Sequence, residues 1–170
     1  MQVVLVELMN WYAVYTLPRA EKKAHAELVR KGINAYLPLL RSLKQWSDRK
    51  KWVEEPLFRS YVFVNIPDNL YFEVLNTPGV VRYVTFEGKA VPIPAVQIEA
   101  VRFFLSSEDL QPENMEQYIP GKSVEVIKGP LKGLYGELVQ YAGRQKVKVE
   151  ISTVGQSILV TIPLGHLKVV

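Results

Sequence analysis

The sequence changes character at residues 107–120, and this break limits how the chain can fold. The segment reads SEDLQPENMEQYIP, and its first thirteen residues contain four acids and no base. It shows no apolar periodicity, which is typical of a segment that connects domains. We therefore predict two domains, residues 1–106 and 120–170, joined by an acidic linker over 107–119. With 48% hydrophobic residues in a chain of 170, each half can bury a core of its own.

Before the break, strand-like segments alternate with helix-like ones. The strand-like segments are rich in aromatic and β-branched residues. The first helix is expected to bury the apolar stripe formed by Ala20, Ala24, Leu28 and Val29. The order β-α-β-β-α-β-α follows the ferredoxin-like plan, an α+β sandwich of helices on an antiparallel sheet. The predicted strands are 11–17, 33–39, 60–66 and 80–86, and the predicted helices are 19–32, 67–79 and 94–105.

After the break, every segment is strand-like. Five short, alternating segments separated by glycine or proline predict a small β-barrel, and their valine and isoleucine content disfavours helix. In residues 146–151, KVKVEI, the apolar side chains are expected to point inward, and Lys146, Lys148 and Glu150 outward. The predicted strands are 124–127, 135–141, 146–152, 157–162 and 167–170.

Residues 126–136, VIKGPLKGLYG, concentrate turn-forming residues between the first two of these strands. Glycine adopts positive φ at little cost, so the cluster predicts a tight turn and a kinked strand entry. Exposed lysines beside such a turn suit RNA phosphate or an acidic protein surface. The turn is predicted at Gly129, Pro130 and Gly133, the kink at Gly136, and the exposed charges at Lys128 and Lys132.

Four segments resemble one family of proteins, and they span residues 10–170 in that family's order. The stretch VEVIKGPLKGLYGELV resembles the KOW motif of small barrel domains. WYAVYTLPRAEKKAHAEL, EEPLFRSYVFVNI and NTPGVVRYV resemble the hallmark segments of the NusG amino-terminal (NGN) domain. The resemblance implies a ferredoxin-like NGN domain followed by a five-stranded, SH3-like KOW barrel.

The resemblance also implies a function in transcription elongation and antitermination. NGN domains dock on the clamp helices of RNA polymerase and suppress pausing and termination, while KOW domains recruit partners such as ribosomal protein S-ten or termination factor Rho. A cytoplasmic monomer with no membrane association is implied, which agrees with the absence of cysteine. The chain looks more like a specialised paralogue of the RfaH/UpxY kind than a housekeeping NusG. In LFRSYVFV, Arg59–Ser60 replaces the usual Pro-Gly pair, so the geometry of that turn is expected to differ from the family's.

Aromatic residues at the matching positions are the expected contacts with RNA polymerase, because the tip of a coiled helix pair offers mostly apolar surface. Aromatic residues on strands are also common in protein cores, and both interpretations are kept for Phe63. A phenol tip favours a surface position for the two tyrosines. The expected contacts are Tyr15, Phe58, Tyr61 and Phe63, with Pro56 shaping their approach.

Basic residues cluster in two places that could bind nucleic acid. The resemblance suggests that the first helix reads exposed non-template DNA, although a solvated helix face has the same pattern. The segment 41–52, RSLKQWSDRKKW, places bases around Trp46 and Trp52, a composition that grips single strands. A merely soluble hairpin is the alternative. The candidates are Arg19, Lys22, Lys23 and Arg30 on the helix, and Arg49, Lys50 and Lys51 in the hairpin.

Catalysis is not expected from this sequence. The two histidines, His25 and His166, have no recognisable nucleophile or carboxylate partner, and no phosphate-binding glycine motif is present. We expect neither a metal nor a cofactor, because the necessary ligand clusters are missing from the sequence. The remaining alternative function is a ribosome-binding or RNA-binding KOW module that does not contact polymerase.

Overall fold

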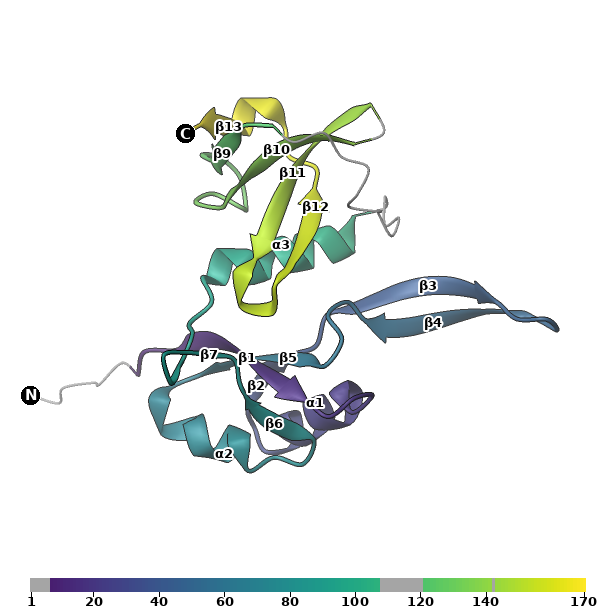
Figure 1. Cartoon of the computed structure of the whole chain (residues 1–170), viewed down its shortest axis with the longest axis vertical. Helices are drawn as coiled ribbons and strands as arrows, with labels where there is room; N and C mark the ends of the chain where they lie inside the picture. The colour runs from purple at the N-terminus through teal and green to yellow at the C-terminus, as the bar shows by residue number, and fades with distance from the viewer. Residues whose placement is uncertain (1–6, 108–120, 142) are drawn as a thin grey trace, which may run out of the picture. The chain divides into compact units, whose positions relative to one another are not determined.

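The chain divides into two compact units in the computed structural model, which describes residues 7–107, 121–141 and 143–170. Unit 1 covers Met1–Ile93 and unit 2 covers Pro94–Val170 (Figure 1). The predicted linker lies almost wholly outside the described residues, so the three predicted segments stay predictions. No helix in the described ranges is long and apolar enough to cross a membrane.

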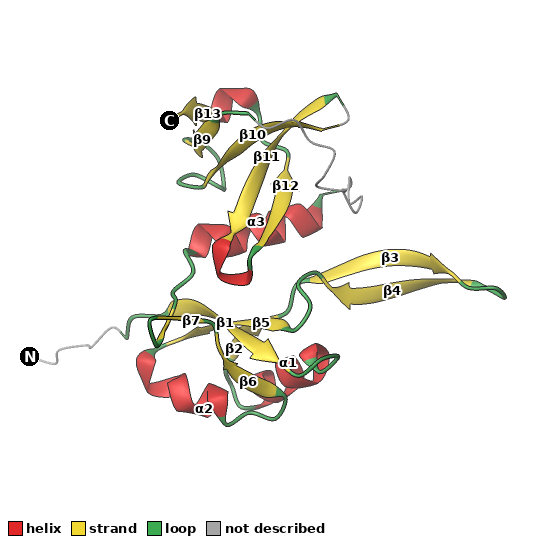
Figure 2. Ribbon diagram, in the orientation of Figure 1, coloured by secondary structure: helices red, strands yellow, loops and turns green. Residues whose placement is uncertain are grey.

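Unit 1 is built on a four-stranded antiparallel sheet in the order β2-β5-β1-β6. Two helices lie on one side of this sheet (Figure 2). This is the α+β arrangement that the sequence predicted. The elements are β1 (Asn10–Thr16), α1 (Glu21–Arg30), β2 (Asn34–Tyr36), β5 (Tyr61–Ile66), the 3-10 turn η1 (Asp68–Leu70), α2 (Tyr71–Leu75), β6 (Val80–Tyr83), β7 (Thr85–Phe86) and β8 (Lys89–Ala90).

The core of unit 1 forms where alternate residues of the central strands meet the helices. Val14 of β1 and Val62 of β5 are fully buried in one cluster with Leu28 of α1 and Val74 of α2. Because successive strand residues point to opposite faces, the odd-numbered residues of β1 and β5 lie on the second face of the sheet.

Helix α1 buries a different stripe from the predicted one. Ala24 and Leu28 are fully buried as expected, but Val29 is 51% exposed. Glu21 takes a buried place on the same face, at a spacing of three and seven residues from Ala24 and Leu28. The prediction for Val29 was wrong because it lies about 100° around the helix from Leu28.

The predicted strand 33–39 is divided between two elements. Its first half is β2, and its last residue begins a long two-stranded hairpin made of β3 (Leu39–Gln45) and β4 (Lys50–Pro56). The hairpin pairs from Leu39 opposite Pro56 to Gln45 opposite Lys50 and extends away from the sheet of unit 1 (Figure 1). Pro38 lies between the two elements, where its lack of an N–H costs no ladder hydrogen bond.

Unit 2 contains all five predicted barrel strands as one antiparallel sheet in the order β12-β11-β10-β9-β13. The ladders of the described residues do not pair the end strands β12 and β13 with each other. Helix α3 lies against β12 and β11 and buries Ile98, Ala100 and Val101. The elements are α3 (Ala95–Ser106), β9 (Ser123–Val126), β10 (Tyr135–Tyr141), β11 (Arg144–Ile151), β12 (Gln156–Val160) and β13 (Leu167–Val169).

Strand β11 confirms the predicted alternation with one exception. Val147, Val149 and Ile151 are buried, as expected. Lys146, which was expected to point outward, is only 8% exposed. Its Nζ lies 5.5 Å from the centroid of the Tyr141 ring, so the aliphatic stem is buried while the ammonium faces an aromatic ring.

The glycine cluster forms the predicted turn. Gly129 and Gly133 have φ of 85° and 89°, and the Gly133 amide donates to the Val126 carbonyl at 2.8 Å. Leu131 and Leu134 are buried beneath the loop. Lys128 and Lys132 are left exposed, as predicted.

Gly136 lies at a close crossing of backbones, as its position at the strand entry predicted. A Cβ atom there would lie 2.6 Å from both the Lys148 carbonyl oxygen and Val147 Cγ1.

We therefore expect Gly136→Ala to destabilise unit 2 by about 1–3 kcal/mol, measured by urea denaturation with the amide NMR signals of unit 2 as the probe. Gly165→Ala is the matched control, because its Cβ would meet no atom within 4 Å. Equal midpoints for the two variants would contradict the crossing.

Candidate protein-binding and nucleic-acid-binding surfaces

Three side chains form a stack across the second face of the unit 1 sheet. Tyr15 on β1 pairs with Tyr61 on β5, and their ring centroids are 4.9 Å apart with the planes tilted by 39°. On the other side, the Arg82 guanidinium carbon from β6 lies 4.9 Å from the Tyr15 ring centroid. Tyr15 and Tyr61 are half-buried and Arg82 is exposed. We call these three residues the tyrosine stack.

The two predicted phenylalanines lie deeper than the tyrosines. Phe58 and Phe63 are 2% and 0% exposed and meet edge to face at 5.9 Å between centroids. Phe63 also stacks on Tyr36 of β2 at 6.5 Å. Pro56, at the end of β4, is half-buried. The tyrosines are therefore the partly accessible aromatic rings among the five predicted polymerase contacts.

The Tyr61 phenol is held in its neutral form. Burial, followed by a side-chain hydrogen bond with Tyr15, raises the pKa of Tyr61 to about 12. Because the Tyr61 phenol is uncharged at neutral pH and its ring lies against that of Tyr15, the tyrosine stack presents an apolar surface with hydroxyl tips. Such a surface suits a partner that offers both apolar and hydrogen-bonding groups.

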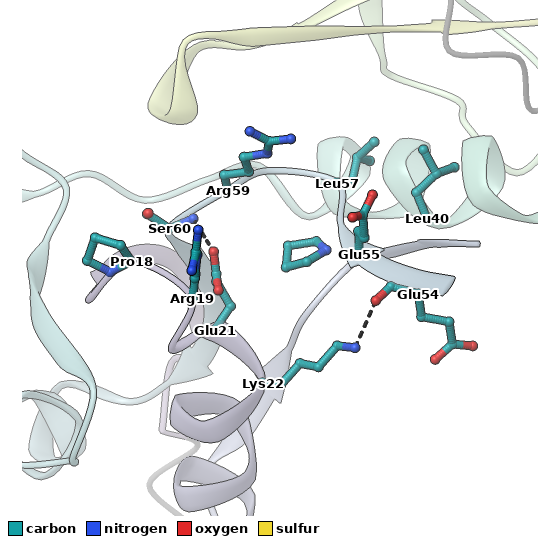
Figure 3. Close-up of a pocket in the computed structure, with 11 residues that line it drawn as sticks. Pro18, Arg19, Glu21, Lys22, Leu40, Glu54, Glu55, Leu57, Arg59 and Ser60 are labelled. Atoms are coloured by element: carbon teal, nitrogen blue, oxygen red, sulfur yellow. Dashed lines mark hydrogen bonds between the residues drawn. The ribbon is translucent and has the colours of Figure 1, made fainter. Parts of the chain in front are cut away.

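A left-handed residue replaces the expected glycine in the turn before β5. Ser60 has φ of 64°, and its amide donates to Glu21 Oε1 at 2.9 Å (Figure 3). The Ser60 carbonyl accepts a hydrogen bond from the Thr16 amide at 2.9 Å. The Glu21 carboxylate therefore fixes the turn at Arg59–Ser60, where the resemblance leads one to expect a Pro-Gly pair. Glu21 was missed because it reads as an ordinary charged residue of the first helical turn.

A pocket of about 680 Å³ lies between the start of α1, the base of the hairpin and the 57–60 turn (Figure 3). Arg19, Lys22 and Arg59 bring positive charge to its lining, and Glu54 and Glu55 bring negative charge. The Lys22 ammonium donates to the Glu54 carbonyl at 2.8 Å, which ties α1 to the hairpin. The lining is therefore mixed in charge.

The structure separates the basic residues predicted on the first helix. Arg19 precedes the helix with φ of 62°, and Lys22 is bonded to the hairpin. Lys23 is exposed. At the other end, Arg30 Nη2 pairs with Glu27 Oε2 at 2.6 Å. Lys23 and Arg30 lie two turns apart on one stripe of the helix, whereas Arg19 lies before the helix and Lys22 is tied to the hairpin, so the four residues do not form a single patch.

The hairpin brings its predicted residues close together at an exposed tip. Arg49, Lys50 and Lys51 are all exposed, and Trp46 and Trp52 are 57% and 55% exposed. Nearer the base, a hydrogen bond from Lys44 holds the pKa of the Glu55 carboxyl below its usual value. The segment from Arg41 to Trp52 contains five bases and one acid.

The two histidines lie in different surroundings. His25 Nε2 lies 3.2 Å from the Ala35 carbonyl oxygen. His166 lies beside the Gly129 turn, where a Cβ on the glycine would come within 3.2 Å of Nδ1. Within the described ranges, no group of three or more His, Cys, Asp or Glu side chains is arranged to hold a metal ion.

The fold and these surfaces define a class of protein in which an α+β unit precedes a small five-stranded β unit. The family model described as transcription termination factor NusG matches residues 9–102. Since this match covers more than half of the chain, the chain belongs to the NusG family.

Relatives match over nearly the whole length. The chain is 26% identical to the transcription termination/antitermination protein NusG of Rickettsia prowazekii over an alignment of 174 residues. This alignment covers 94% of this chain and 89% of that protein. It is 27% identical to the protein of the same name in Bacillus subtilis, covering 86% of this chain and 90% of that one. A solved structure of Thermotoga maritima NusG, described by its domain interaction, matches with a TM-score of 0.53 and 20% identity over 96% of this chain and 98% of that one.

The Glu21 carboxylate should matter for stability. We expect Glu21→Ala to lower the free energy of unfolding of unit 1 by about 1–3 kcal/mol, because the Ser60 amide loses a charged acceptor. Urea denaturation followed by tryptophan fluorescence reports on this unit, since all three tryptophans lie in it. Glu27→Ala removes a surface partner of Arg30 and should cost less than about 1 kcal/mol. If both variants lose the same stability, Glu21 does not fix the turn.

The raised pKa of Tyr61 predicts a pH dependence. The pKa of Tyr61 is about 12 in the folded state, above the usual 10. The contribution of Tyr61 to the free energy of unfolding is therefore complete below pH 10 and is lost as the pH rises towards 12. Carbon-13 NMR titration of labelled tyrosine should show Tyr61 ionising above pH 10, and Tyr15→Phe should lower its pKa. An unchanged pKa in that variant would show that the hydrogen bond with Tyr15 has no effect.

Proposed function

We propose that this chain is a transcription elongation and antitermination factor that binds RNA polymerase through the second face of the unit 1 sheet. The relatives are named transcription termination/antitermination proteins, which supports a role in transcription. The single observation that supports the binding site is the tyrosine stack. It lies on the sheet face opposite the α1 and α2 core, at positions where the resemblance expects polymerase contacts.

The chemistry of the stack suits an amphipathic helical partner such as the clamp helices of polymerase. Tyr15 and Tyr61 offer flat apolar rings with hydroxyl tips, and Arg82 offers a planar cation beside them. Tyrosine and arginine are enriched among the residues that dominate binding energy at protein interfaces. Phe63 lies on the same face of β5 as Tyr61, but it is buried and meets Phe58 edge to face. Bound there, the factor would suppress pausing and termination.

The basic side of α1 is a second element of the proposal. Arg19 and Lys23 are exposed and could contact the phosphates of non-template DNA. Lys22 would contribute mainly by holding the base of the hairpin. The RfaH/UpxY kind of specialisation remains a prediction from the resemblance. A transcription factor of this family would act in the cytoplasm.

Unit 2, which contains the KOW-like segment, is proposed to recruit a further partner through the exposed turn at Gly129–Gly133. Lys128 and Lys132 project from a loop that Leu131 and Leu134 anchor, so a partner would meet a rigid basic edge. Ribosomal protein S-ten and termination factor Rho are the candidates. The same lysines favour the alternative function, a ribosome-binding or RNA-binding KOW module that does not contact polymerase.

Binding to a clamp-helix fragment of RNA polymerase tests the proposal. Tyr61→Ala should weaken binding by about tenfold or more and restore pausing in a transcription assay, because a central aromatic anchor is lost. Tyr135→Ala, which removes a 62% exposed tyrosine of unit 2, is the matched control and should bind normally. Phe58→Ala is a poor probe because Phe58 is buried. Binding to ribosomal RNA without any binding to the fragment would favour the alternative.

A further inference from the structure

The β3–β4 hairpin has two chemically different faces. In an antiparallel ribbon, residues directly opposite each other point to the same side, and successive pairs alternate between sides. The observed register therefore separates neighbouring basic residues of the tip. Lys50, opposite Gln45, lies on one face, and Lys51, opposite Lys44, lies on the other.

The first face centres on Trp46, and we call it the Trp46 face. Lys44 and Lys51 are directly opposite each other. Trp46 continues the alternation, and its amide donates to the Arg49 carbonyl at 2.8 Å, which places Arg49 opposite it. One exposed indole is therefore grouped with three cations in two adjacent cross-strand pairs.

The opposite face, which we call the Trp52 face, is organised differently. Trp52 is opposite Leu43, and the guanidinium carbon of Arg41 lies 4.9 Å from the centroid of the Trp52 ring. That cation therefore already covers one side of the Trp52 ring. Trp46, which is 57% exposed at the tip, is the more accessible platform for a planar ligand.

The charge arrangement of the Trp46 face favours an anionic ligand. Like charges placed directly opposite each other destabilise a β-ribbon, so the Lys44–Lys51 pair costs stability in the free protein. Glu55 on the same face accepts a hydrogen bond from Lys44 and offsets part of the repulsion. Lys51 is exposed opposite Lys44. A phosphate bound between the two lysines would offset the remaining repulsion between them.

We propose that the Trp46 face binds an unpaired nucleic-acid strand, with one base stacked on Trp46 and the flanking phosphates held by Lys44, Arg49 and Lys51. An exposed indole among cations is the combination that binds single strands without sequence preference. A duplex offers phosphates but no free base to stack. The inference rests on the proposed function, because a factor bound to transcribing polymerase meets unpaired DNA and unpaired RNA.

Fluorescence anisotropy of the full chain with labelled oligonucleotides tests the site. The probes are a twelve-residue oligo-dT, the matching oligo-rU and a duplex of the same length. We expect Trp46→Ala to weaken binding to a single strand by about tenfold, the loss of one base stack. Trp52→Ala should change it less than about twofold. Trp46→Phe should recover part of the affinity, which separates stacking from a folding defect.

Two adjacent lysines provide a matched charge test. Lys51→Gln should weaken single-strand binding and reduce the slope of log K against log salt by about 0.7, the effect of one lost phosphate contact. Lys50→Gln, on the other face, should leave both nearly unchanged. A preference for dT or for rU supports the site in either case and identifies which strand it meets.

Several outcomes would overturn the inference. One is equal affinity for the single strand and the duplex. Another is an equal loss of affinity in the two tryptophan variants or in the two lysine variants. The last is binding to an acidic protein surface with no binding to any oligonucleotide. Binding to the clamp-helix fragment is measured in parallel. A chain that binds the fragment but no single strand refutes the hairpin site alone, and a chain that binds single strands but not the fragment refutes the proposed function alone.

Discussion

The alternation of side chains along β1 and β5 is the constraint on which unit 1 depends. One set of residues, including Val14 and Val62, is buried against α1 and α2. The other set is thereby placed on the opposite face, where Tyr15 and Tyr61 meet across the strands. A shift of one residue in the pairing would exchange the two sets, so the packing of the core also determines the position of the tyrosine stack.

Much of the fold could be predicted because the patterns in the sequence are local. The strands of unit 2 and the turn at Gly129 and Gly133 follow from short-range alternation and from the φ that glycine permits. The errors have tertiary causes. Lys146 reads as an outward residue, but it is buried because its ammonium finds the Tyr141 ring, which the alternation of β11 cannot reveal. Val29 was assigned to the wrong stripe because one residue of rotation moves a side chain far around the helix.

The candidate site was predictable in residue type but not in arrangement. Tyr15 and Tyr61 were selected from the sequence, but their contact with each other and with Arg82 depends on strand register. Composition marked the hairpin tip as basic and aromatic, yet it could not separate Lys50 from Lys51. Glu21 gave no signal, because its acceptor role depends on the position of Ser60, thirty-nine residues further along the chain.

The first turn of α1 is bonded to two other segments of unit 1 through two neighbouring residues. Glu21 holds the Ser60 amide, and Lys22 holds the Glu54 carbonyl at the root of the hairpin. These bonds make the helix end a common anchor for the arm formed by β3 and β4 and for the strand that presents Tyr61. Because the two bonds come from adjacent residues, a movement of the arm relative to the bend before β5 requires at least one of them to break or rearrange.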